Sequence, residues 1–293
     1  MSKKISTFRS PEGEAQYLAA YQAVLGQWPV PYEELTIPTR FGDTHVVASG
    51  PQSAAPLILL HPAGGGATIW VRNAGPLSQR YRVYAVDTIS EPNKSLLTRR
   101  ISLHQRPAFA DWMADLLNGL QIERVDLVGN SFGGFLAVNT ILNLPERVKK
   151  AVLISPAATF APIPSWSWHF IPANLFGPLI GSQRMLLDPY NWIWQDFPKD
   201  ECMAQLRALT ALYGRPKHWS PTVFSDEELR TIRTPILLLI GDHEVIYKPE
   251  QAIQRATRLV PGLQAEIVPN ANHIAEYTAP DFVNARILEF LAD

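Results

Sequence analysis

Short aliphatic runs, most of them separated by segments long enough for a helix, restrict the fold of this chain most strongly. Each run has four or five residues, and they are Leu57–Leu60, Arg82–Val86, Val125–Gly129, Ala151–Ile154, Ile236–Ile240 and Ala265–Val268. Strands that helices cover on both faces of a parallel sheet are continuously apolar in this way. The alternation therefore predicts an α/β fold with a mostly parallel, twisted sheet flanked by helices.

Two further elements are expected before the first of these runs. Ser10 and Pro11 fit the cap and first turn of a helix that closes near Gly26. The segments Glu34–Pro38 and Thr44–Ala48 then flank a turn, which predicts an antiparallel hairpin at the sheet edge.

The segment 157–225 interrupts the alternation. It has no clear strand, contains many prolines, and holds five of the eight tryptophans: Trp166, Trp168, Trp192, Trp194 and Trp219. We expect a helical cap, or lid, over the carboxyl ends of the strands, where open α/β sheets bind ligands. Ordinary core packing of these tryptophans is the alternative. The expected organisation is a helical preamble at 1–33, an α/β core at 34–156 and 226–293, and the cap at 157–225.

Composition excludes several functions. The 293 residues include 26 Lys and Arg against 27 Asp and Glu, a net charge of −1 that gives no reason to expect a nucleic-acid or membrane partner. Cys202 is the only cysteine, which excludes an internal disulfide and a cysteine-based metal site. No apolar run approaches the roughly 18 residues of a membrane helix, and no secretory signal is evident. We therefore expect a cytoplasmic protein, whose oligomeric state stays open.

The segment Gly129–Gly134 carries the strongest chemical signal. It reads Gly-Asn-Ser-Phe-Gly-Gly and lies between the strand Val125–Val128 and a helix. Gly-x-Ser-x-Gly at a sharp strand-to-helix turn presents the serine as a nucleophile. Ser131 is therefore the predicted catalytic serine. The alternative is a glycine-rich turn whose serine only caps the helix.

A serine nucleophile needs a base that a third group orients. Among seven histidines, His273 follows the last strand in a turn-rich loop that can reach the carboxyl edge of the sheet. After a serine turn of this kind, the acid follows the serine and precedes the histidine in the chain. Asp242 meets this requirement and lies directly after the strand Ile236–Ile240 and Gly241. We expect Asp242 to orient His273, with Glu244 as the rival.

The loop after Leu57–Leu60 reads His61-Pro-Ala-Gly-Gly-Gly66. A tetrahedral oxyanion needs two N–H donors, one from such a loop and one from the residue after the nucleophile. Phe132 is the second. Because Pro62 has no N–H, Ala63 is the expected first donor, with Gly64 as the alternative. His61 is expected to be a structural loop residue.

Other chemistries lack sequence support. There is no His-Glu-x-x-His, no carboxylate cluster at metal spacing, and no lysine after the glycines that would make a phosphate loop. The glycines after the first parallel strand also lack the dinucleotide-binding spacing. We expect no metal and no cofactor.

The chain carries, in this order, the glycine-rich loop His61–Gly66, the serine turn with Ser131, the acid Asp242 and the histidine His273. This order resembles that of the α/β-hydrolase superfamily, and the resemblance extends from about Leu35 to the end of the chain. Five segments more narrowly resemble bacterial carboxylesterases that cleave arylpropionate (naproxen-type) esters: Ala85–Ile89, Asn93–Ser95, Leu153–Ala157, Phe224–Leu229 and Gly241–Tyr247. The preamble helix also looks like theirs. The resemblance implies a capped serine carboxylesterase with the triad Ser131, Asp242 and His273.

Two departures from the superfamily pattern bear on function. His61-Pro62 stands where many members have His-Gly, which affects the first oxyanion donor. The segment Asp87–Pro92 replaces the Asp-x-x-Gly-x-Gly-x-Ser of related peptidases, which weakens a prolyl-aminopeptidase interpretation. Haloalkane dehalogenases and epoxide hydrolases, which have a similar fold, carry aspartate at the position of Ser131. The serine therefore disfavours both of these activities.

The sequence thus predicts a hydrolase of small carboxylic esters with apolar or aromatic acyl groups. A carbon–carbon bond hydrolase or a thioesterase could use the same triad, and perhydrolysis could accompany it. From a different class, a hydrolase-fold binding protein would keep the pocket without turnover.

Overall fold

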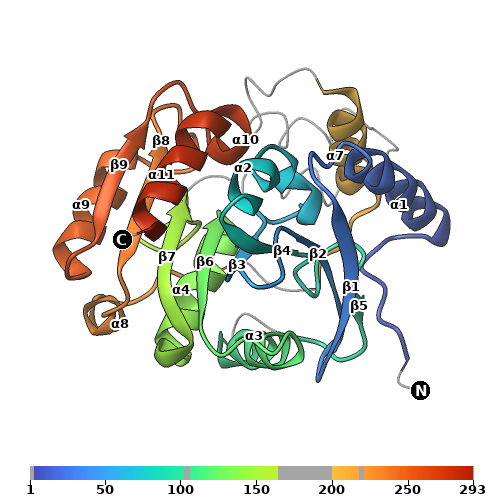
Figure 1. Ribbon diagram of the computed structural model, residues 1–293, viewed down its shortest axis with the longest axis horizontal. Coiled ribbons are helices and arrows are strands. Elements are labelled where there is room, and N and C mark those ends of the chain that lie inside the picture. The colour runs from blue at the N-terminus through green and yellow to red at the C-terminus, as the bar shows by residue number, and fades with distance from the viewer. Residues whose placement is uncertain (1–2, 102–105, 164–199, 218–220, 293) are drawn as a thin grey trace.

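The computed structural model describes residues 3–101, 106–163, 200–217 and 221–292. Their strands form one nine-stranded sheet (Figure 1). The strands are β1 (Tyr32–Thr39), β2 (Gly42–Ser49), β3 (Ala55–Leu60), β4 (Tyr81–Val86), β5 (Leu96–Leu97), β6 (Val125–Asn130), β7 (Val148–Ile154), β8 (Ile236–Gly241) and β9 (Gln264–Val268). Each predicted aliphatic run lies inside one of the strands β3, β4 and β6 to β9.

The strand order changes direction at β3, which lies between β4 and β6 in the sheet. The order is β1-β2-β4-β3-β6-β7-β8-β9, with β5 paired to β2 outside this path. From β4 to β9 neighbouring strands are parallel, whereas β1 and β2 form the predicted antiparallel hairpin. The chain continues from β3 to β4 on one side and reaches β6 on the other. At such a switch point the loops leaving the two central strands diverge, and ligands bind between them.

Helices cover both faces of the sheet, which confirms the predicted α/β fold (Figure 1). On β3, Ile58 and Leu60 point into one apolar cluster, and Leu57 and Leu59 into the other. The first cluster contains residues of α3 (Arg106–Gly119), α4 (Phe132–Asn143), α8 (Asp226–Thr231) and α9 (Pro249–Leu259). The second contains residues of α1 (Pro11–Leu25), η1 (Ala67–Arg72), α2 (Ala74–Ser78), α7 (Glu201–Tyr213), α10 (Ala275–Thr278) and α11 (Pro280–Ala292). A short turn of helix, η3 (Pro145–Arg147), precedes β7.

The preamble helix α1 packs beside α7, the described helix of the predicted cap (Figure 1). The Ser10 side chain caps α1 by accepting a hydrogen bond from the Gly13 N–H, as predicted. An isolated bridge joins Phe8 to Gly214, the residue that follows α7. The preamble therefore packs against α7 and the residue that follows it. The five tryptophans of segment 157–225 lie outside the described residues.

None of the helices in the described ranges has both the length and the apolar character needed to span a bilayer.

Candidate active site

The predicted nucleophile occupies a strained turn between β6 and α4. Ser131 has φ 51° and ψ −112°, a conformation that L-residues adopt only when the surroundings impose it. Its N–H donates to the carbonyl of Ile154, and its carbonyl accepts from the N–H groups of Phe135 and Ala157. These three bonds fix the turn. The Ser131 side chain makes no capping bond to α4, which argues against the helix-cap alternative.

Close packing against β3 explains the glycine two residues after Ser131. A Cβ on Gly133 would overlap the carbonyl oxygen of Leu60, the last residue of β3. In the parallel pairing of β3 with β6, Leu60 lies opposite Gly129. The loop that begins at His61 therefore leaves the sheet directly beside the turn that holds Ser131.

A side chain next to Ser131 fastens the histidine loop to the same place. The Nδ2 of Asn130 donates to the carbonyl of His273 at 3.0 Å and to that of Ile154 at 3.3 Å. Asn130 is fully buried. The sequence motif contains this asparagine without indicating its role, because the bond spans 143 positions.

His273 lies in the loop after β9 and contacts a glutamate. Its Nδ1 is 2.7 Å from Oε2 of Glu244, and the side chains are 2% and 0% exposed. Its Nε2 is buried and has no hydrogen-bond partner among the described residues. An imidazole held by a carboxylate at Nδ1, with Nε2 left for a hydroxyl, has the arrangement of a general base.

The expectation that Asp242 orients His273 is wrong. The Asp242 carboxylate instead accepts the N–H groups of Asn270 and Ala271, each at 3.0 Å, and its side chain is 37% exposed. Burial acts to raise its pKa, but these two bonds outweigh it and lower the pKa. Asp242 therefore anchors the loop that carries His273 without reaching its ring.

A turn after β8 brings the rival acid into place. The Glu244 N–H donates to the carbonyl of Gly241 at 3.2 Å, which closes a turn over residues 241–244. This turn directs Glu244 inward, where its Oε1 accepts the Ile246 N–H at 2.8 Å.

Glu244 is held in its charged form. Burial acts to raise its pKa, but the neighbouring His273 charge and hydrogen bond, with further help from the Ile246 N–H, lower it overall. A buried carboxylate that stays ionised can stabilise an imidazolium.

The loop after β3 contains a β-turn in which the N–H groups of Gly64 and Gly65 have acceptors and that of Ala63 has none among the described residues. Gly65 N–H donates to the Pro62 carbonyl at 3.0 Å, and Gly64 N–H donates to Oε2 of Glu91 at 3.0 Å. Within the described part of the chain, no acceptor is found for the Ala63 N–H. Of the two expected loop donors, the geometry therefore favours Ala63. Phe132, the other expected donor, is the first residue of α4, where helix N–H groups lack intrahelical acceptors.

His61 is structural, as expected. Its Nε2 accepts the Thr88 N–H at 2.9 Å, and its Nδ1 lies 2.8 Å from the Pro62 carbonyl. Both ring nitrogens are thus engaged inside the fold, and neither is left to act as a base.

A buried acid network supports the other end of the same loop. Asp87, at 0% exposure, accepts the Ala67 N–H at 2.6 Å and contacts Nδ1 of His45 at 3.0 Å. Nε2 of His45 is 2.7 Å from Glu34. Burial acts to lower the His45 pKa, but hydrogen bonding and charge from Asp87, together with Glu34, raise it overall. The His45 ring thus links the β1–β2 hairpin, through Asp87, to the residue that follows the loop after β3.

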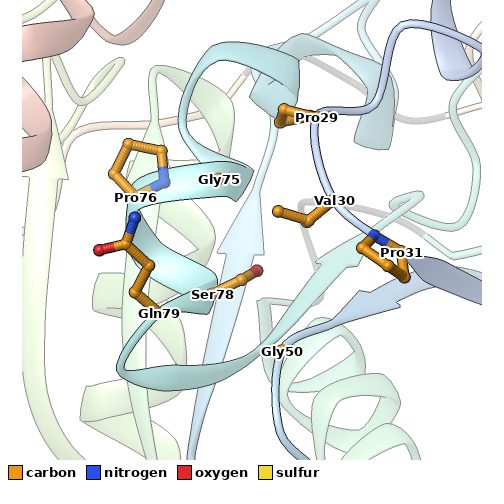
Figure 2. Close-up of a pocket in the computed structure, with 8 residues that line it drawn as sticks. All are labelled: Pro29, Val30, Pro31, Gly50, Gly75, Pro76, Ser78 and Gln79. Atoms are coloured by element: carbon orange, nitrogen blue, oxygen red, sulfur yellow. The ribbon is translucent and has the colours of Figure 1, made fainter.

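A separate shallow cavity of about 550 Å³ carries no such chemistry (Figure 2). Gly50 follows β2 and Ser78 ends the helix before β4, so the cavity opens near the amino ends of the parallel strands. Its lining residues include no acid, base or thiol: Pro29, Val30, Pro31, Gly50, Gly75, Pro76, Ser78 and Gln79.

No group of three or more metal-ligating side chains is found in the described ranges. The chemistry that the described site offers is a serine, a histidine and a glutamate, with backbone donors beside them.

This geometry agrees with the family to which the chain is matched. Residues 57–286 match the model of the alpha/beta hydrolase family, and the chain belongs to that family.

Its similarity to particular members is more specific. The chain is 37% identical to carboxylesterase YbfK of Bacillus subtilis over 97% of this chain and 96% of that protein. The crystal structure of carboxylesterase CesB (YbfK) from Bacillus subtilis superposes with a TM-score of 0.87, at 36% identity over 96% of this chain and 98% of the other. Naproxen esterase (carboxylesterase NP) from Bacillus subtilis superposes with a TM-score of 0.86, at 35% identity over 97% and 99%. The predicted resemblance to carboxylesterases, and the expectation of a hydrolase, are confirmed.

Proposed function

We propose that this chain hydrolyses carboxylic esters through an acyl-enzyme on Ser131. His273 takes the proton of the Ser131 hydroxyl as the oxygen attacks the ester carbonyl. Glu244 holds the imidazole and stabilises its charged form, and the N–H groups of Ala63 and Phe132 stabilise the oxyanion. The alcohol leaves with a proton from His273, and water then repeats the sequence on the acyl-enzyme.

The buried pair of Glu244 and His273 carries this proposal. Its geometry leaves Nε2 as the one ring nitrogen available to Ser131, and Asn130 ties the loop of His273 to the nucleophile turn. A surface histidine would need neither the buried contact with Glu244 nor the bond from Asn130 to its carbonyl.

The proposed substrates are small esters with apolar or aromatic acyl groups. A small cavity contacts the glycines of the loop after β3, and it is lined both by the apolar Ile69, Met203 and Leu206 and by Thr68, Thr210 and Arg207. The proposed acyl preference therefore rests on the relatives of this chain. A relative of this chain is a naproxen esterase, and naproxen esters have an aromatic acyl group. We propose that segment 157–225 caps this side of the site.

The mechanism can be tested with a fluorophosphonate and short p-nitrophenyl esters. We expect one adduct, located on Ser131 by peptide mapping, and rapid ester turnover by the same protein. Ser131→Ala should stay folded and lose both. Folded wild-type protein without adduct or turnover would favour a binding protein. Preferential cleavage of diketones or acyl thioesters would favour the other hydrolase classes.

The acid is assigned by a matched pair of variants. Replacing the acid of a triad by its amide typically lowers kcat by about 10⁴-fold, because the histidine adopts the wrong tautomer. We expect a loss of that order in Glu244→Gln, whereas Asp242→Asn should stay within about threefold of the wild type once its folded fraction is accounted for. The reverse pattern would restore Asp242 as the acid.

A further inference from the structure

Positive charge is concentrated where three segments of the chain lie beside one another. The segments 3–9, 97–100 and 213–217 together contain seven lysines and arginines and no aspartate or glutamate. Lys4 forms an ion pair with Glu14. Within the described part of the chain, no ion pair is found for the other six, which are Lys3, Arg9, Arg99, Arg100, Arg215 and Lys217.

Backbone pairing fixes these segments against one another. The first segment bridges the second at Ile5 and the third at Phe8. Two hydrogen bonds of 2.8 Å flank the bridge at Phe8, one donated by the Arg9 N–H and the other by the Arg215 N–H. The third segment is also tied to the loop after β4, where a carbonyl accepts the Lys217 N–H at 2.8 Å. The fold itself therefore brings these cations together.

The charged side chains are close enough to influence one another. Burial lowers the pKa of Lys217, and the positive charges of Arg215, Arg100 and Arg9 lower it further. We refer to these four residues as the basic cluster. Arginine stays protonated in proteins, so the repulsion among the three arginines does not disappear by titration. Such repulsion destabilises the compact state, and an anion bound among the cations would offset it.

An open cavity of about 580 Å³ lies beside the basic cluster, and Arg100 belongs to both. Two further arginines, Arg40 and Arg99, line the cavity. Arg40 is held in ion pairs with Asp111 and Asp115, at 3.3 and 2.8 Å. Arg99 and Arg100 are not held in this way. The cavity therefore presents two guanidinium groups that no acid of the described residues neutralises.

The chemistry of these groups indicates the class of ligand. Guanidinium groups bind phosphate oxygens in bidentate pairs, and concave surfaces with charges of one sign concentrate counter-ions. Because the cations come from three segments, a ligand with more than one anionic group can reach several of them. A membrane or a nucleic acid fits less well, since acids outnumber bases in the rest of the chain and would repel an extended anionic partner.

We propose that the basic cluster and the adjoining cavity bind a small polyanion with two or more phosphate groups, which joins the preamble, the loop after β5 and the segment after α7. None of these residues belongs to the proposed catalytic site, so the inference does not depend on ester hydrolysis. A ligand that binds only the folded chain also stabilises it.

Isothermal titration calorimetry with inorganic pyrophosphate tests the proposal, at constant ionic strength and without divalent metal. We expect one pyrophosphate to bind per chain. Arg100→Gln and Arg215→Gln each remove one charged donor and should weaken binding about 5- to 50-fold. Arg80→Gln is the control, because it removes the same charge from an exposed arginine just before β4, outside the cluster. Its affinity for pyrophosphate should stay within about twofold of the wild type.

Thermal unfolding separates binding from simple screening of charge. Pyrophosphate should raise the thermal midpoint of the wild type more than sodium chloride does at the same ionic strength, and Arg100→Gln and Arg215→Gln should lose most of this difference. Without ligand and at low salt, both variants should be at least as stable as the wild type, because each removes a repelling charge. A loss of pyrophosphate binding then cannot come from misfolding.

Three results would overturn the proposal. They are equal stabilisation by pyrophosphate and by sodium chloride, equal affinity of the wild type, the cluster variants and the control, and sedimentation with phosphatidylglycerol vesicles by a protein that binds no pyrophosphate. The last result would assign the basic cluster to a lipid surface instead.

Discussion

Replacing Glu276 by glutamine should stabilise the fold at neutral pH. Glu276 lies on α10 and is 0% exposed. Neither of its carboxyl oxygens has a hydrogen-bond partner among the described residues. Burial raises its pKa from 4.5 to about 8. The folded protein therefore keeps this carboxyl neutral at pH 7, whereas the unfolded chain ionises it.

The size of the effect follows from the linkage between protonation and folding. A folded-state pKa above the unfolded value means that stability is fully present below about pH 4.5 and is lost as the pH rises toward 8. Each pH unit in this window costs about 1.4 kcal/mol. At pH 7 the loss reaches about 3 kcal/mol. Glutamine cannot ionise, so Glu276→Gln should be more stable than wild type by up to that amount at pH 7, and nearly equal to it near pH 4.5.

The assay is urea unfolding between pH 4.5 and 8.5 of the wild type, of Glu276→Gln, and of Glu123→Gln, which alters an exposed glutamate. The free energy of unfolding of the wild type and of Glu123→Gln should fall with pH relative to that of Glu276→Gln. Parallel curves for all three proteins, or a glutamine variant that is less stable at pH 7, would refute the reasoning. Either result would mean that Glu276 is ionised in the fold.

Three further predictions follow from the packing. Gly133→Ala places a Cβ against the Leu60 carbonyl, so ester turnover should fall at least 10-fold and the thermal midpoint should drop. His45→Gln removes an imidazole whose raised pKa makes its contribution to stability largest below about pH 6.5 and lost at higher pH; the loss of stability measured in urea should therefore shrink between pH 6 and pH 9. Arg255→Met removes hydrogen bonds to the carbonyls of Phe160 and Phe224, which join the two ends of segment 157–225. Urea unfolding should show a loss of about 1–3 kcal/mol, and a loss below 0.5 kcal/mol would contradict this role.

Much of the fold could be predicted because strands that are buried on both faces of the sheet are continuously apolar in the sequence. The central strands β6 and β8 are buried at every position, since helices cover both sides of the sheet. The places of Ser131 and His273 in the fold could be predicted for a related reason. Each follows the carboxyl end of a parallel strand, and topology brings such ends to one edge.

The orienting acid was predicted wrongly because a single turn decides it. Asp242 and Glu244 are two positions apart in the loop after β8, and both carry a carboxylate. The closure of the Gly241–Glu244 turn points the Glu244 side chain inward. The Asp242 carboxylate instead accepts hydrogen bonds from backbone N–H groups of the loop after β9. Proximity to the strand end does not contain this information.

The choice between Ala63 and Gly64 was open for a different reason. The acceptor that engages the Gly64 N–H is Glu91, 27 positions later in the chain. Nothing within the glycine-rich loop indicates that one of its amides is already bound. The bond between Asn130 and the carbonyl of His273 escapes local patterns in the same way, since the two residues belong to distant segments.

The Asn130–His273 bond also bears on how the enzyme acquires activity during synthesis. The turn with Ser131 and the loop with Ala63 emerge in the first half of the chain, and β9 is the last strand to be added to the sheet. The histidine loop then has to dock on side chains made much earlier. Under the proposed mechanism, a nascent chain that lacks β9 would therefore have Ser131 without its base. Ester cleavage should then begin only when β9 and its loop have joined the sheet.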